Sequence, residues 1–260
     1  MIKFFRKIRQ NLLAENKFSK YLIYAIGEII LVVIGILIAL QINNWNENKK
    51  ASNSERAILI GLKSEFQNNL ITIDSTIQAN KNVSQACALL TQIIRSDELE
   101  EKTKIVDSLI LRILLVSSFD ANTGVTDEIL NSGKLELIKS KIIRDRITGW
   151  TGKLKDIEED VEFRFVNYNE SLIPFLTEYF PLSNGDIYKK NINGLNEKYI
   201  NNYKSYSNFK PDYNEINLMK MENVIWHHKH NNDYVISQDY SIRKEILEII
   251  DIVNKELEKK

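Results

Sequence analysis

Apolar residues are most concentrated near the N-terminus, where residues 21–40 read YLIYAIGEIILVVIGILIAL and carry a single charge, Glu28. At about 1.5 Å of helical rise per residue, about 20 such residues cover the roughly 30 Å hydrocarbon core of a bilayer. A cleaved signal peptide has a shorter apolar region of about 7–15 residues and a small-residue cleavage site, whereas this run ends in IALQINNW. A buried core helix is the other alternative. The pattern predicts a transmembrane helix over residues 21–41, retained as an anchor.

Basic residues flank this segment unevenly, with six on its N-terminal side and three over a comparable length on the other side. Because positively charged flanks stay inside, we expect residues 1–20 in the cytoplasm and the rest of the chain to be exported across the membrane. Residues 1–20 either form an interfacial helix on anionic headgroups or serve only to set the topology. The candidate membrane-surface residues are Lys3, Arg6, Lys7 and Arg9.

Beyond a juxtamembrane linker predicted at residues 42–52, apolar positions recur every three or four residues, as in amphipathic helices. The stripes predict helices over residues 52–95 and 103–116, and a short helix from about Thr126 to Gly133, where glycine favours a helix end. The clearest pattern is a near-heptad seam over residues 140–179, with Phe165 as one member and a kink expected at Pro174. A final helix carries the seam from Ile242 onward. Residues 186–211 have weak periodicity and are expected to be irregular.

Glycine (9 residues) and proline (3 residues) are scarce in the chain, which favours long helices over a many-stranded sheet. The long apolar stripes must pack against one another to leave water. The sequence therefore predicts an all-α protein: a single transmembrane helix, then an exported domain at residues 53–260. That domain is expected to be an antiparallel bundle of about four main helices, with long coiled-coil-like helices.

Charge and motifs add few candidates for chemistry. Lys plus Arg number 35, as do Asp plus Glu, so no basic excess favours nucleic acid as a partner. The single cysteine, Cys87, excludes an intrachain disulfide framework. Nucleophile, phosphate-loop, dinucleotide and HExxH motifs are missing. His227 and His230 have the spacing of a helical metal pair, but no further ligand completes a set, so a solvated face is favoured. We expect no enzyme activity, no metal and no cofactor.

Glu28 is the anomaly of the anchor, because an ionised side chain in mid-membrane costs at least about 2.5–3.5 kcal/mol. Three interpretations of Glu28 compete. In the first, the membrane tolerates the side chain because it is protonated or snorkels to the interface. In the second it contacts another transmembrane helix, and in the third it handles protons or ions in a larger complex. Gly27, Leu31, Gly35 and Ala39 repeat every four residues beside it. Such a small-residue stripe lets a second backbone approach closely, which favours the second interpretation.

Two stretches of the sequence are similar to a known family. The first is MIKFFRKIRQNLL with KYLIYAIGEIILVVIGILIALQINNWNE, and the second is TDEILNSGKLELIKSKIIRDRITGW. Together they resemble an uncharacterised family of bacterial single-pass envelope proteins that carries a domain-of-unknown-function label. The resemblance implies an anchor in a bacterial inner membrane, an exported helical domain in the periplasm and no established activity.

Three functional hypotheses follow from these observations. The first is an interaction or scaffolding protein that contacts the lipid bilayer and another transmembrane protein, or a second copy of itself. The second is an accessory subunit of an ion-driven membrane complex that uses Glu28. The third is a sensor whose exported bundle acts through a partner.

Overall fold

The computed structural model describes residues 18–191 and 205–259, and every regular element in these two ranges is helical. The α-helices are α2 (Phe18–Arg95), α3 (Thr103–Ile113), α4 (Gly124–Asn131), α5 (Lys141–Asn167), α6 (Ile173–Tyr179) and α7 (Leu218–Glu258). The other elements are the 3-10 helices η1 (Lys134–Leu137) and η3 (Leu182–Asn191) and a π-helical turn, η2 (Tyr168–Leu172). The all-α prediction is confirmed.

The chain divides into two compact units, Met1–Ala57 and Ile58–Lys260, and α2 contributes residues to both. Residues 42–52, which we expected as a linker, are instead helical within α2. That stretch has neither glycine nor proline, so nothing in it ends a helix.

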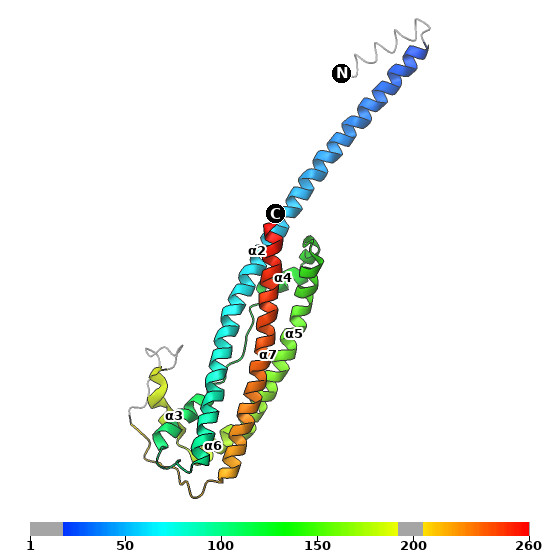
Figure 1. The fold of residues 1–260 in the computed structure, drawn as a ribbon. Coiled ribbons are helices and arrows are strands. Elements are labelled where there is room, and N and C mark those ends of the chain that lie inside the picture. Colours follow the sequence, from blue (N-terminus) through cyan, green and yellow to red (C-terminus); the bar gives the residue numbers. More distant parts are fainter. Residues whose placement is uncertain (1–17, 192–204, 260) are drawn as a thin grey trace. The chain divides into compact units, whose positions relative to one another are not determined.

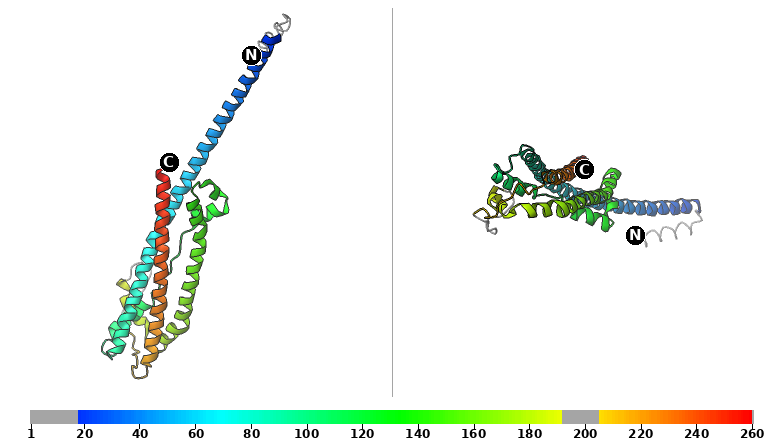
Figure 2. Two further views of the ribbon diagram at one scale, coloured as in Figure 1. Left: turned by 45° about the vertical axis from the view of Figure 1, so that its right-hand side comes forward. Right: turned by 90° about the horizontal axis from the view of Figure 1, so that it is seen from below.

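Three long helices build the second unit (Figures 1 and 2), and side-chain pairs between them give their directions. Residues that come later in α2 or in α5 pair with residues that come earlier in α7. α7 is therefore antiparallel to both helices. The pairs are Asp74–Arg243 and Arg95–Glu222 between α2 and α7, and Arg146–Glu245 and Arg164–Asn232 between α5 and α7. α2 and α5 consequently run parallel to one another.

The parallel pair arises because the chain returns from α3 to α4 without forming a long helix. Residues 115–123, here called the crossing segment, have no regular structure and run alongside the long helices (Figure 1). They read LVSSFDANT, which is rich in serine, aspartate and asparagine, residues that favour caps and turns over helix interiors. Among the described residues, the bundle thus has three long helices rather than about four.

The long helices carry coiled-coil-like seams in which buried residues alternate by three and four. On α2 the buried seam is Leu59, Leu62, Phe66, Asn69, Ile73, Thr76, Asn80, Val83, Cys87, Leu90 and Ile94. On α7 it is Met221, Ile225, His228, Asn232, Val235, Asp239, Ile242, Ile246, Ile249 and Val253. On α5 the seam passes through Arg164, which is buried, and the expected member Phe165 is only half-buried.

The apolar core is split into two clusters. One cluster contains Leu59, Trp150 and Ile246, and the other contains Leu90 and Phe175, each with its neighbours. Along each long helix, polar seam residues lie between the two clusters. These residues, here called the polar layer, are Asn80 of α2, Arg164 of α5, and His228, Asn232 and Asp239 of α7.

Several predicted boundaries shift in the structure. α7 begins at Leu218, well before the expected start of its seam at Ile242, because the polar members of the seam hide its first half. Pro174 lies in the first turn of α6, directly after the π turn η2, so the helical run continues to Tyr179 across a widened turn. Gly133 has a φ of +74°, the left-handed conformation expected where α4 ends. Part of the region expected to be irregular forms η3.

Candidate functional site

The residues predicted to form the transmembrane contact stripe lie on the part of α2 that belongs to the first unit. α2 is the one helix among the described residues that is long and apolar enough to cross a membrane, with a mean hydropathy of 2.6 over its most apolar window. Gly27, Leu31, Gly35 and Ala39 are exposed and Glu28 is half-buried. A Cβ added at Gly27 or Gly35 would meet no atom within 4 Å. The stripe is therefore an open helix face. The basic residues Lys3, Arg6, Lys7 and Arg9 lie outside the described residues.

In the second unit, two asparagines of α2 hold the main chain of the crossing segment. Asn69 donates from Nδ2 to the carbonyl of Asn122 at 2.8 Å and accepts from the N–H of Asn122 at 2.8 Å. Asn80 forms the same pair with Ser117, at 2.9 and 3.0 Å. Each side-chain amide thus replaces the neighbouring strand that would normally satisfy an extended backbone.

A third α2 residue, Glu65, caps the short helix α4 from outside. Its carboxylate accepts from the N–H of Val125 at 2.5 Å and from the N–H and hydroxyl of Thr126 at 3.2 and 2.5 Å. These N–H groups belong to the first turn of α4, which has no partners within its own helix, and a negative charge there is also favourable. Glu65 fixes where the crossing segment ends.

The polar layer completes the support at the start of the crossing segment. Arg164 donates from Nη2 to the carbonyl of Ser117 at 2.8 Å and from Nη1 to Asn232 Oδ1 at 3.2 Å. Asn232 in turn donates to the carbonyl of Asn80 at 2.7 Å. His228 Nε2 lies 2.8 Å from the carbonyl of Ile113 and therefore carries the proton on that nitrogen. Three helices and the crossing segment are joined in one buried network.

Two members of the layer have strongly shifted acidity. Burial is the main cause that lowers the pKa of His228 to about 4; the hydrogen bond to Ile113 opposes this shift and the charge of Arg164 adds to it. Burial raises the pKa of Asp239 to about 6, although Arg164 and the amide of Asn80 oppose that rise. Burial also lowers the pKa of the Arg164 guanidinium, which the charge of Asp239 partly offsets. The layer therefore holds opposite charges whose ionisation depends on the fold.

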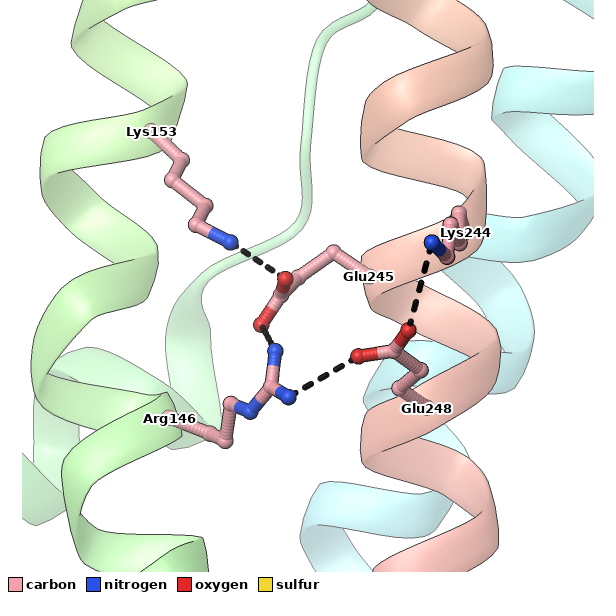
Figure 3. A network of polar contacts seen from close by, with 5 residues as sticks. All are labelled: Arg146, Lys153, Lys244, Glu245 and Glu248. Carbon is pink, nitrogen blue, oxygen red and sulfur yellow. Dashed lines mark hydrogen bonds and ion pairs between the residues drawn. The ribbon is translucent and has the colours of Figure 1, made fainter.

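A second polar group joins α5 to α7 nearer the end of the bundle (Figure 3). Glu245 is 7% exposed and accepts from Lys153 and from Arg146, the latter at 2.7 Å. Arg146 also pairs with Glu248 at 2.9 Å. Burial alone would raise the pKa of Glu245, but the bonds from Lys153 and Arg146 outweigh it and lower the pKa below its ordinary value.

The three histidines separate in space rather than forming one solvated face. His228 is 1% exposed and belongs to the polar layer. His230 stacks on Trp226 with ring centroids 5.0 Å apart, and His227 meets the same ring edge-on. The expected solvated face is confirmed for His227 and His230, which are exposed. His228 lies in the buried seam, because every third or fourth residue of α7 turns into the bundle.

Comparison with protein families gives one assignment. A family model described as a family of unknown function, DUF6090, matches residues 28–209. The chain belongs to the DUF6090 family. Comparison with curated proteins and with solved structures found no match. The DUF6090 match begins inside the apolar stretch at Glu28 and includes Asn80 and Arg164, but it ends before α7.

Sequence reasoning missed the polar layer of this DUF6090 protein. Asn80, His228 and Asp239 interrupt the apolar stripes, so the apolar pattern that predicts a helix weakens wherever they occur. The available signal was their spacing: each lies at a position three or four residues from its apolar neighbours. A polar residue in register with a coiled-coil seam is buried, and it needs a hydrogen-bond partner on another element.

Proposed function

We propose that this DUF6090 protein is a single-pass membrane protein whose helical bundle serves protein–protein interaction or scaffolding in the cell envelope. The observation that carries this proposal is the exposure of the large apolar side chains of residues 22–42, which ranges from 47% to 71%. Consecutive positions such as Ile29 to Ile34 cover the whole circumference of the helix. A helix that is apolar all round and has no protein cover needs lipid.

The proposal places the N-terminus in the cytoplasm and the bundle in the periplasm of a bacterial inner membrane. Support comes from the excess of basic residues before the apolar stretch. The proposal assigns the protein no catalytic role and no cofactor.

Association within the membrane is proposed through the face of Gly27, Leu31, Gly35 and Ala39, against a second copy or another transmembrane protein. Gly35→Leu tests it sharply, because a Cβ added at Gly35 meets no atom within 4 Å. We therefore expect a loss of association to come from a clash with a neighbouring helix. The matched control is Val33→Leu, which enlarges an exposed residue about 200° away around the helix.

The experiment is crosslinking in native membranes followed by mass spectrometry of the captured species. We expect the wild type and Val33→Leu to give the same crosslinked product, and Gly35→Leu to lose most of it. Equal crosslinking by all three proteins would contradict the proposal that this face mediates association. Recovery of the unmodified chain in the soluble fraction would contradict the proposed membrane anchor.

The alternative function, an accessory subunit of an ion-driven complex, rests on the carboxyl group of Glu28 inside the apolar stretch. Glu28→Gln separates the two proposals, since glutamine keeps the shape and the hydrogen bonding but not the ionisation. Association that survives this change while ion-dependent function is lost favours the ion-handling role. Loss of association alone favours a helix–helix contact through Glu28.

A further inference from the structure

Arg164 of α5 and Asp239 of α7 are opposite charges enclosed in the polar layer, at 1% and 0% exposure. They make neither an ion pair nor a hydrogen bond with each other among the described residues. Arg164 Nε and both carboxylate oxygens of Asp239 have no hydrogen-bond partner in the described part of the chain. Arg164 Nε and the two carboxylate oxygens of Asp239 are therefore buried without a hydrogen bond among the described residues.

The neighbouring side chains are already committed elsewhere. Asn80 uses its amide on the main chain of Ser117. Asn232 donates to the carbonyl of Asn80 and to Ser84, at 2.7 and 2.8 Å, and accepts from Arg164. The amide of Asn80 lies near enough to Asp239 to lower the pKa of its carboxyl, but it makes no hydrogen bond to either carboxylate oxygen. Asn232 cannot turn to Asp239 without breaking a buried bond of its own. An unpaired buried charge costs several kcal/mol, so a further partner is required.

The charges themselves select the chemistry of that partner. A cation would be repelled by the guanidinium of Arg164, and an anion would be repelled by the carboxylate of Asp239. The partner must accept a hydrogen bond from Nε–H and donate one to a carboxylate oxygen while remaining neutral. Water is the smallest molecule that does both, and buried waters in proteins typically bind two to four such groups.

We propose that at least one ordered water molecule bridges Arg164 Nε and the Asp239 carboxylate, and that it is a fixed component of the bundle. This water joins α5 to α7 at the level where the crossing segment enters the core. It also explains how two apolar clusters can be separated by a layer of charge within one bundle. The proposal is independent of the membrane function.

The test is a crystal structure of the full chain, grown in a lipid mesophase, at a resolution that shows ordered solvent. We expect a solvent peak within hydrogen-bond distance, about 2.7–3.2 Å, of both Arg164 Nε and one Asp239 oxygen. A direct ion pair between the two side chains would overturn the proposal. So would a dry contact in which both side chains have turned to other protein groups.

A second arm uses variants and counts long-lived waters by oxygen-17 magnetic relaxation of the full chain in detergent. The double variant Arg164→Met/Asp239→Leu removes both polar ends and should lose at least one long-lived water. Asp239→Asn retains an acceptor and a donor and should keep it. An unchanged count in a folded double variant contradicts the proposal. If that variant does not fold, the wild-type solvent peak and the Asp239→Asn count still decide.

Discussion

Asn80 occupies a seam position of α2. Its side-chain amide donates to the carbonyl of Ser117 and accepts from the N–H of Ser117. Asn80→Ala leaves the half-buried N–H of Ser117 unpaired, whereas the carbonyl of Ser117 keeps its bond from Arg164. We expect the free energy of unfolding of the second unit to fall by about 1–3 kcal/mol. Denaturant titration of the full chain in detergent measures it.

The matched control for this prediction is Gln78→Ala on the same helix. Gln78 is exposed and bonds only to Asn82 one turn away, at 3.2 Å. Its loss should change the free energy of unfolding by less than about 0.5 kcal/mol. Similar losses for the two alanine variants would show that Asn80 does not hold the crossing segment.

Two residues of the polar layer titrate between pH 7 and pH 4 with opposite effects on stability. The pKa of His228 falls from 6.5 to about 4 on folding, so its contribution is present above pH 6.5 and is lost as the pH falls through that window. The pKa of Asp239 rises from 3.8 to about 6, so its contribution is present below pH 3.8 and is lost as the pH rises through 6. Each effect amounts to at most about 3 kcal/mol, and in the wild type they largely cancel.

Single variants should separate the two effects. In Asp239→Asn only His228 still titrates in this range, so the melting temperature should fall steeply as the pH is lowered from 6.5 to 4. His228→Gln keeps a donor for the carbonyl of Ile113, but only Asp239 still titrates in this range. The melting temperature of this variant should therefore rise as the pH is lowered from 6.5 to 4. Thermal melts of the full chain at four or five pH values test both. Parallel profiles for the two variants would contradict the opposed windows.

Among the elements, periodicity predicted those whose buried side is apolar. α5 was recognised through Ile143, Ile147 and Trp150, and the end of α7 through Ile246 and Ile249. The contacts of the crossing segment could not be predicted, because its partners Asn69, Asn80 and Arg164 lie far from it in the sequence. The polar seam residues of α7 itself, His228, Asn232 and Asp239, weaken the apolar pattern over the first half of that helix. Where a bundle buries polar residues, spacing is a better guide than hydrophobicity.

The α5–α7 pair also depends on Glu245, whose carboxylate lies between Arg146 and Lys153 (Figure 3). Glu245→Gln leaves two cations facing a neutral amide, and we expect a loss of about 1–3 kcal/mol in the free energy of unfolding. Asp251→Asn is the control, because its pair with Lys255 is exposed and lies within one helix. Because Glu245 is buried, the loss should persist at high salt. A loss that salt abolishes would place this network among ordinary surface pairs.

At the scale of the whole molecule, the orientation of the chain should depend on the basic residues before the apolar stretch. Replacing Lys3, Arg6, Lys7 and Arg9 with glutamine leaves two basic residues on the N-terminal side against three on the other side, which removes the bias that keeps this end inside. A reporter fused after Lys260 should then shift substantially from the periplasm to the cytoplasm. Replacing Lys49, Lys50 and Arg56 instead strengthens the original bias and should change nothing. A reporter that is cytoplasmic in the unaltered chain would reverse the proposed topology, and equal behaviour of both charge variants would show that another feature sets it.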